Sequence, residues 1–153
     1  MRAVELEIDP GQPARIEIQL LPYQGKLETR TIEVPIPATY AGEEVDIEIE
    51  PGFEADRPVP APENVRELVA GLRTQSYPAE SLIATVKIEG EAGAAFRGRL
   101  ASRLPPGAID ALRSNSSSVA PETFAALQQT VHPMQRFVVG RDRVRVKVRP
   151  NLR

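Results

Sequence analysis

Strict alternation of apolar and polar residues in the first fifty positions constrains this chain more than any other feature. Successive side chains of a β-strand point to opposite faces, so each alternating segment has one apolar and one polar face. We predict strands at about residues 2–8, 14–21, 27–36 and 43–50, forming a four-stranded antiparallel meander over residues 1–50 whose apolar face must be covered. The apolar positions are Val4, Leu6 and Ile8; Ile16, Ile18 and Leu20; Ile32, Val34 and Ile36; and Val45, Ile47 and Ile49.

Proline and glycine mark the turns between these segments. Residues 9–13, 22–26 and 37–42 contain the residue types that set turn conformations. Pro35 cannot donate a hydrogen bond to a neighbouring strand, so the third strand is expected to end at a sheet edge or a bulge. Short strands with turns between them indicate a sandwich or a barrel rather than βαβ units.

The middle of the chain predicts helices and further strands. Residues 51–62 resemble an extended proline-rich connector. Residues 63–74 predict a helix whose apolar stripe we expect to pack on a sheet rather than to dock a partner; the stripe is formed by Val65, Leu68, Val69 and Leu72. The rest predicts a strand at 81–89, a turn at 90–93, a partner strand at 94–100, a short helix at 108–113, a loop at 114–118, and either helix or strand at 122–130.

The C-terminal segment predicts a hairpin with a strongly basic strand. Residues 136–139 predict a strand, residues 140–142 a tight turn, and residues 143–149 alternate valine with arginine or lysine. Residues 1–60 hold 13 acidic against 5 basic residues, and residues 61–153 hold 8 acidic against 14 basic ones. We therefore expect the basic strand to lie beside an acidic one, at residues 4–8 or 45–49, with cross-strand ion pairs that each contribute about 0.2–1 kcal/mol. Such pairs would select the neighbour and register more than they would add stability.

Composition and length favour one soluble domain over residues 1–153. The chain is 41% hydrophobic and 26% charged, which is typical of globular proteins. It has no apolar run near the roughly 20 residues that cross a bilayer. The N-terminus enters a strand pattern at once, so either the chain is cytoplasmic or a leader or larger parent has been removed. The predicted fold is α+β, mainly β: an immunoglobulin-like antiparallel β-sandwich with two or three short helices, the helices and remaining strands lying in residues 63–153.

Residues that could carry out chemistry are few and scattered. His132 is the single histidine, and there is no cysteine, so a structural zinc site is not expected. A catalytic triad would need a serine and an acid beside His132. None of the serines has a nucleophile-elbow pattern, and we expect His132 to be solvated or to cap an element; the serines are Ser76, Ser81, Ser102 and Ser114 to Ser118. We predict no enzyme activity and no catalytic site.

Ligand-binding patterns are equally sparse. The carboxylates of Asp46, Glu48 and Glu50, with Glu43 and Glu44 before them, could attract calcium, but a solvated strand face is favoured. No glycine-rich phosphate loop occurs. We therefore predict no metal site, no cofactor-binding site and no cofactor.

Macromolecular contacts could involve a few aromatic and basic residues. Phe96, Arg97 and Arg99 form a fragment of an aromatic and basic strip, but the chain is only 5% aromatic, and we expect no nucleic-acid partner. The three tyrosines fall in predicted loops, where they would either contact a partner or anchor the loop to the core; they are Tyr23, Tyr40 and Tyr77.

Three stretches together carry a family resemblance. They are VELEIDPGQPARIEIQLLPYQGKLETRTIEVPIP, PAPENVRELVAGLRTQSYPAESLIATVKIEG and FVVGRDRVRVKV. They resemble the non-catalytic C-terminal region behind the peptidase domain in SpoIVB-like serine peptidase homologues of Gram-negative bacteria. No catalytic residue carries over, because the peptidase portion is absent and His132 lies in no matching motif. The resemblance implies a periplasmic, cell-envelope or exported setting and an accessory role beside a protease.

The sequence thus favours a non-catalytic protein-interaction or scaffolding module, accessory to a larger envelope or exported protein. Its expected partner is a protein, such as a protease domain of the same parent chain, without membrane insertion. The alternative is a small-ligand or carbohydrate-binding β-sandwich module, which needs a concave, aromatic-lined site. A hydrolase that uses His132 is the third hypothesis.

Overall fold

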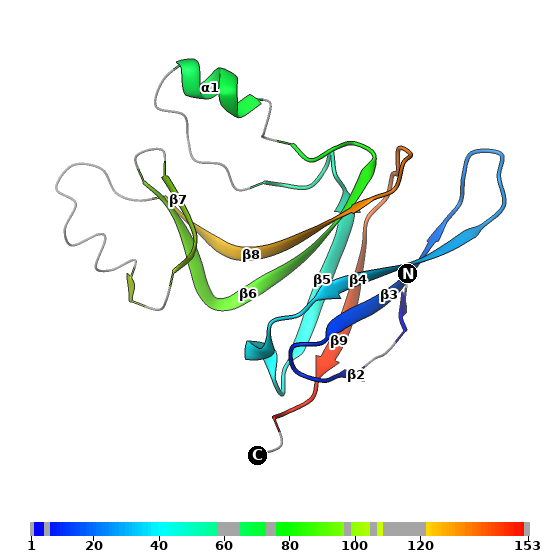
Figure 1. Cartoon of the computed structure of the whole chain (residues 1–153), viewed down its shortest axis with the longest axis horizontal. Helices are drawn as coiled ribbons and strands as arrows, with labels where there is room; N and C mark the ends of the chain where they lie inside the picture. The colour runs from blue at the N-terminus through cyan, green and yellow to red at the C-terminus, as the bar shows by residue number, and fades with distance from the viewer. Residues whose placement is uncertain are drawn as a thin grey trace. The chain divides into compact units, whose positions relative to one another are not determined.

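The chain is mainly β and its strands form two sheets (Figure 1). The computed structural model describes residues 2–4, 7–57, 65–72, 76–96, 99–104, 107–108 and 122–151. The broad prediction of a mainly β chain with two sheets is confirmed.

The smaller sheet is three-stranded and antiparallel. Its order is β1 (Arg2–Ala3), β3 (Pro13–Leu20) and β4 (Glu28–Pro35). Strands β3 and β4 form a hairpin that pairs Pro13 with Pro35 at one end and Leu20 with Glu28 at the other. Strand β4 is an edge of this sheet, as the position of Pro35 predicted.

The larger sheet has six strands. Its order is β2 (Glu7–Ile8), β9 (Asp142–Val148), β5 (Glu44–Pro51), β6 (Ser81–Phe96) and β7 (Arg99–Leu104), and β8 (Glu122–Pro133) also pairs with β6. The β2–β9 pair is parallel, whereas β9–β5, β5–β6 and β6–β7 are antiparallel.

The four-stranded meander predicted over residues 1–50 is wrong in its pairing. The first predicted strand is two short strands, β1 and β2, which join different sheets. The 3-10 helix η1 (Ala38–Tyr40) follows β4, and β5 then joins the larger sheet instead of pairing with β4. Alternation fixes which face of a strand is buried, but the neighbour depends on contacts distant in sequence.

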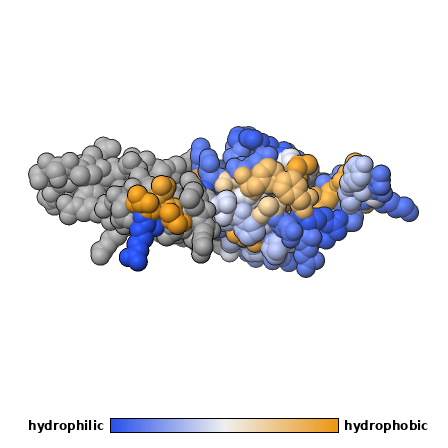
Figure 2. Space-filling view, turned by 90° about the horizontal axis from the view of Figure 1, so that it is seen from above, coloured by the Kyte–Doolittle hydropathy of each residue, from blue (hydrophilic) through white to orange (hydrophobic). Residues whose placement is uncertain are grey.

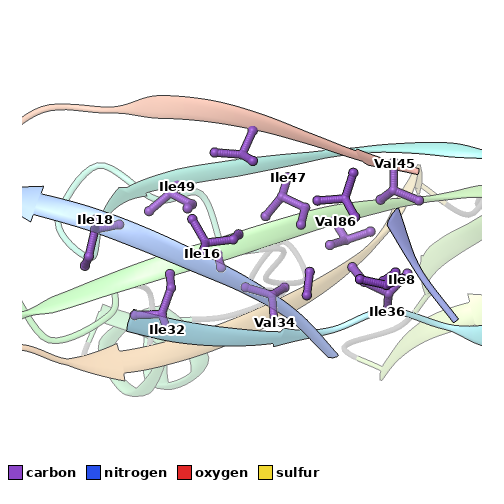
Figure 3. Packing of buried hydrophobic residues seen from close by; sticks show 14 of the residues in the cluster. Ile8, Ile16, Ile18, Ile32, Val34, Ile36, Val45, Ile47, Ile49 and Val86 are labelled. Carbon is purple, nitrogen blue, oxygen red and sulfur yellow. The ribbon is translucent and has the colours of Figure 1, made fainter. Parts of the chain in front are cut away.

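One apolar core lies between the two sheets (Figure 3). Alternate residues of β3, β4, β5 and β9 point into it, as the sequence pattern predicted. Strands of both sheets contribute, so the arrangement is sandwich-like. The core includes Ile8, Ile16, Ile18, Ile32, Val34, Ile36, Val45, Ile47, Ile49, Val86, Val144, Val146 and Val148.

Backbone contacts divide the chain into two compact units. Unit 1 comprises Met1–Pro51, Glu80–Val86 and Gln129–Arg153, and unit 2 comprises Gly52–Ala79 and Lys87–Gln128. The apolar core described above belongs to unit 1. The sequence predicts a single domain over residues 1–153.

Unit 2 contains the helix α1 (Val65–Leu72), which lies within the range predicted from the sequence. Its apolar side chains Val65, Leu68 and Val69 are exposed rather than packed on a sheet, so the expected packing of this stripe is wrong. An apolar stripe shows that a helix has something to bury, but it does not identify the surface that covers it. Of the connector predicted at 51–62, Pro51 ends β5 and residues 58–62 lie outside the described residues. The loop at 114–118 and most of the helix predicted at 108–113 also lie outside them.

Three predictions of secondary structure between residues 90 and 139 can be compared with the structure. The turn predicted at residues 90–93 is wrong, because β6 continues to Phe96 with an irregularity between Ala92 and Ala94. The partner strand predicted at 94–100 is β7, which starts only at Arg99. The ambiguous residues 122–130 are strand, within β8. The strand predicted at 136–139 is wrong: this segment is irregular, although Gly140 takes the left-handed backbone (φ 100°) of the turn before β9.

Candidate functional site: an apolar groove at one end of a charge-paired sandwich

The basic strand β9 lies between two acidic strands of unit 1. Its register places Lys147 opposite Glu44, Arg145 opposite Asp46 and Arg143 opposite Glu48 of β5. On its other side, Lys147 is paired with Glu7 of the parallel strand β2. The predicted pairing of the basic strand with an acidic neighbour is confirmed, and it involves both candidate strands.

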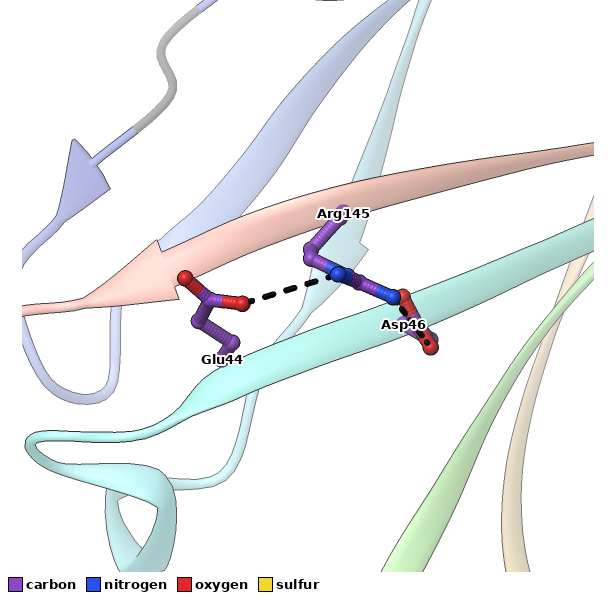
Figure 4. Close-up of polar contacts among 3 residues, drawn as sticks. All are labelled: Glu44, Asp46 and Arg145. Atoms are coloured by element: carbon purple, nitrogen blue, oxygen red, sulfur yellow. Dashed lines mark hydrogen bonds and ion pairs between the residues drawn. The ribbon is translucent and has the colours of Figure 1, made fainter.

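Ion pairs follow this register along the exposed face. The Nε of Arg145 donates to Oδ1 of Asp46 at 2.8 Å, and its guanidinium lies 3.8 Å from Glu44 (Figure 4). The hydrogen bond from Arg145 holds the pKa of Asp46 below its usual value, and the same bond raises the pKa of Arg145. Further pairs are Arg143 with Glu48 at 3.9 Å, Lys147 with Glu7 at 3.4 Å, and Arg149 with Glu7 at 3.7 Å and with Asp9 at 3.2 Å.

These pairs determine what the charged face can bind. Asp46 and Glu48, which the sequence offered as calcium ligands, instead face arginines of β9. Within the described ranges, no group of three or more histidine, aspartate or glutamate side chains is arranged to hold a metal ion. The basic side chains of β9 likewise have carboxylate neighbours, which would repel nucleic-acid phosphates. The structure therefore gives this face a role in strand pairing.

His132 is half-buried in unit 1. It lies near the end of β8, and its Nε2 is buried and has no hydrogen-bond partner among the described residues. Burial lowers the pKa of His132, which favours the neutral imidazole. The His132 side chain as a whole is half-buried, so its solvated or capping role stays a prediction. Of the candidate serines, Ser81 is buried and Ser76 exposed, while Ser114 to Ser118 lie outside the described residues.

An apolar groove lies at one end of unit 1. It has a volume of about 830 Å³ and lies between the β3–β4 turn and the segment that follows β8. Four of its apolar side chains are well exposed: Leu21, Tyr23, Phe137 and Val139. Figure 2 shows apolar surface gathered beside strongly hydrophilic surface. We call this feature the tip groove; it is lined by Gln19, Leu20, Leu21, Pro22, Tyr23, Gln24, Arg136, Phe137, Val138 and Val139.

Buried side chains and backbone hydrogen bonds fix the base of the tip groove. Leu20 and Val138 pack against the core. The buried Met134 precedes the second wall, and its amide donates to the carbonyl of Glu80 at 2.8 Å. Arg136 then donates to both carboxylate oxygens of Glu28 on β4, at 3.1 and 3.2 Å. Both bonds come from the same guanidinium nitrogen, Nη1, and they connect the irregular segment to the start of β4.

Backbone strain is concentrated at the tip groove. Among the described residues, the non-glycine residues with positive φ are Gln24 (57°) and Gln135 (59°). Gln24 lines the groove, and Gln135 immediately precedes its second wall. A left-handed backbone is uncommon for residues other than glycine, and such strain is frequent at binding sites. The turn around Gln24 is closed by the amide of Gly25, which donates to the carbonyl of Pro22 at 3.0 Å.

The three tyrosines have three different environments. Tyr23 is 93% exposed on the tip groove, and its contact role stays a prediction. Tyr40 is buried in the core, which matches the anchoring alternative. In unit 2, the guanidinium of Arg57 lies 5.3 Å from the ring centre of Tyr77. For the other predicted contact strip, Arg97 lies outside the described residues.

Sequence reasoning missed most of the tip groove. Leu21 was placed at the end of a predicted strand, and Phe137 and Val139 in another, so all three were expected to belong to ordinary strand faces. The sequence feature that pointed to this surface was Tyr23, an aromatic residue beside Pro22 in a predicted turn. What the sequence could not show is that two loops more than a hundred residues apart lie side by side.

Comparisons with known proteins give no relative from which a function could be transferred. No family model matches the chain, and neither a curated protein nor a solved structure matches it. Within the described part of the chain, every helix is too short or too polar to cross a bilayer.

Proposed function

We propose that this chain is a non-catalytic protein-interaction or scaffolding module and that the tip groove is its contact surface. The observation that carries the proposal is the clustering of Leu21, Tyr23, Phe137 and Val139 around one groove. Single exposed apolar residues are ordinary, but a contiguous apolar patch with a polar border is typical of an interaction site.

The chemistry of the tip groove suits a protein partner. Tyrosine and phenylalanine are enriched at protein interfaces because they bury large areas at a small cost in side-chain entropy. The amide side chains of Gln19 and Gln24 line the same groove and supply hydrogen-bonding groups at its border. The base is held by the core and by the Arg136–Glu28 contact, so little ordering is required when a partner binds.

The family resemblance suggests which partner to examine first. It implies an accessory role beside a serine peptidase in the bacterial cell envelope, so we propose a peptidase domain of the same parent chain as the partner. We also propose that the sandwich is immunoglobulin-like. Support comes from the split first strand, whose two parts, β1 and β2, join different sheets, with β2 running parallel to the last strand.

A charge inside the tip groove should abolish binding. Phe137→Asp places a carboxylate on an apolar wall, so the complex with the peptidase domain should be lost on size exclusion at about 50 µM, where a weak interface is still populated. The control is Thr39→Asp, which makes the same change in charge at an exposed site in η1, beyond the opposite end of β4. Equal binding by both variants and the unaltered chain would refute the groove as the contact surface.

A small-ligand or carbohydrate-binding module is the second candidate function. Its supporting observation is that the groove volume of about 830 Å³ falls within the range of small-molecule sites, with two aromatic rings that could stack on a sugar. A thermal-shift screen against glycans and calcium tests it. A raised melting temperature that Phe137→Asp abolishes would favour this alternative over the protein-interaction function.

A further inference from the structure

We propose that β4 of one copy of this chain pairs with β4 of a second copy, antiparallel and about a two-fold axis. The first observation is that β4 lies at an edge of the smaller sheet, where β3 is its one paired strand among the described residues. None of the residues of β4 lines the tip groove, so self-association through this edge does not depend on the proposed function.

Hydrogen bonds within the smaller sheet show which backbone groups of β4 face its outer edge. The amide of Val4 donates to the carbonyl of Arg15 at 2.9 Å, so the backbone groups of Arg15 face β1. Backbone direction alternates along a strand, so the next residue, Ile16, faces β4, where it lies opposite Ile32. By the same alternation, three residues of β4 direct their N–H and C=O groups to the outer edge: Thr29, Thr31 and Glu33.

The outer edge of β4 is regular and accessible. The pairing of β3 with β4 runs without a shift from one end of the hairpin to the other. Residues 28–34 contain no proline or glycine. The three residues with outward backbone groups also have exposed side chains. An edge of this kind is a template for another strand, which bulges or prolines within an edge strand normally prevent.

A second copy fits this edge because β4 is complementary to itself. With the axis at Thr31, the two Thr31 residues exchange both backbone hydrogen bonds, and Thr29 does the same with the partner's Glu33. Directly opposed threonines stabilise a strand pair, and no like charges lie directly opposite each other. Pro35, which has no N–H group, stays outside this set of donors.

Other two-fold registers are less favourable. An axis at Arg30 or at Glu33 places like charges directly opposite each other. An axis at Ile32 places Pro35 opposite Thr29, where the proline has no hydrogen to donate. An axis at Thr29 pairs half of β4 with the turn that precedes it. Charge and backbone donors therefore select one arrangement, which is a closed two-fold dimer.

The same register covers an exposed apolar side chain at each end of the strand pair. Leu27 immediately precedes β4 and is 58% exposed. The axis at Thr31 places Leu27 opposite the partner's Pro35, and Pro35 is also exposed. The paired segment is short, so we expect a dissociation constant above about 1 µM, since even interfaces of standard size can be that weak.

Two lysine substitutions on the same exposed face test the register, because they predict opposite results. Thr31→Lys places two like charges directly opposite each other, so the dissociation constant should rise by about 5-fold or more. Thr29→Lys places a lysine opposite the partner's Glu33, so association should be retained or strengthened. Sedimentation equilibrium between about 10 and about 500 µM measures all three proteins, and circular dichroism should show equal strand content.

The result that would overturn the pairing is equally direct. An unaltered chain that stays monomeric over this range would leave the edge for a strand of another protein. Association that Thr31→Lys leaves unchanged, or that both lysines weaken equally, would refute the axis at Thr31. Phe137→Asp lies in the tip groove and should leave self-association unchanged, so failure of the β4 pairing is distinguishable from failure of the proposed function.

Disulfide trapping between copies provides a second readout, since the chain has no cysteine of its own. In a dimer of Thr31→Cys the two cysteines form a hydrogen-bonded pair with Cα atoms about 5.5 Å apart, which a disulfide can span. In a dimer of Thr29→Cys they are four residues out of register, about 13 Å apart. Mild oxidation should link the copies of Thr31→Cys and not those of Thr29→Cys, and any other outcome would refute this register.

Discussion

Replacing Ile47 by alanine should strongly destabilise unit 1, because this side chain lies at the centre of its core. Ile47 has no exposed surface, and in the register of the larger sheet it lies opposite Val86 on one side and Val144 on the other. Truncating a buried isoleucine to alanine costs about 2–5 kcal/mol, and the upper part of that range applies where the surroundings cannot collapse. With a paired strand on each side, we expect a loss of about 4 kcal/mol in the free energy of unfolding.

Urea unfolding followed by circular dichroism measures this loss. The midpoint should fall with an unchanged dependence on urea, because the surface exposed on unfolding stays the same. At roughly 2–4 °C for each kcal/mol, the melting temperature should fall by about 8–16 °C. Ile47→Val is the matched control and should cost only about 0.5–1.5 kcal/mol. A loss below about 1 kcal/mol for Ile47→Ala would refute the placement of Ile47 in a tightly packed core.

Three further outcomes test individual features. Burial lowers the pKa of His132 below 6.5, so the unfolded chain binds a proton at this residue more readily than the folded chain does. The free energy of unfolding should therefore fall as the pH drops through 6.5. In urea titrations at several pH values, His132→Phe should reduce this fall. Gly42 has a φ of +88°, so Gly42→Ala should cost about 1–2 kcal/mol by thermal unfolding, whereas Gly71→Ala in α1 should be neutral or stabilising. Reversing Asp46 to arginine should lower the melting temperature at low salt, the added change Arg145→Asp should restore it, and about 1 M NaCl should remove most of the difference.

The sequence was sufficient to predict the strands whose alternation is strict. Strands β3, β4, β5 and β9 lie where the pattern placed them, with the predicted apolar residues buried except for Leu20, which is partly buried. The acidic partner of β9 was also predictable, because like charges on neighbouring strands would repel one another. Each of these predictions depends only on residues within one strand or on the sign of its charges.

Features that depend on distant contacts were not predictable in this way. The alternation of residues 2–8 is the same whether they form one strand or two, so the division between β1 and β2 leaves no local signal. Gly90 and Gly93 are typical of a turn, yet β6 continues through both, and next to Gly93 it pairs with β7 at Ala92 and Ala94. Cross-strand pairing thus outweighs the local turn propensity.

The tip groove shows the same limit for function. Phe137 and Val139 have the composition of a buried strand, and only the structure reveals that their side chains are exposed beside Tyr23. The stripe of α1 is equally ambiguous, since an apolar helix face has the same sequence whether it packs internally or contacts a partner. Exposure, which separates a core from a contact surface, is a property of the fold.

Disulfide trapping tests the central claim, that the basic strand β9 pairs with the acidic strand β5 in a single register. The chain has no cysteine, so pairs can be introduced without competition. Glu48→Cys with Arg143→Cys places the two residues directly opposite, within the Cα separation of about 4.4–6.8 Å that a disulfide requires. Glu44→Cys with Arg143→Cys moves one partner four residues along the strand, about 13 Å away. We expect mild oxidation to close the first pair and not the second; closure of the second, or of neither, would contradict the account.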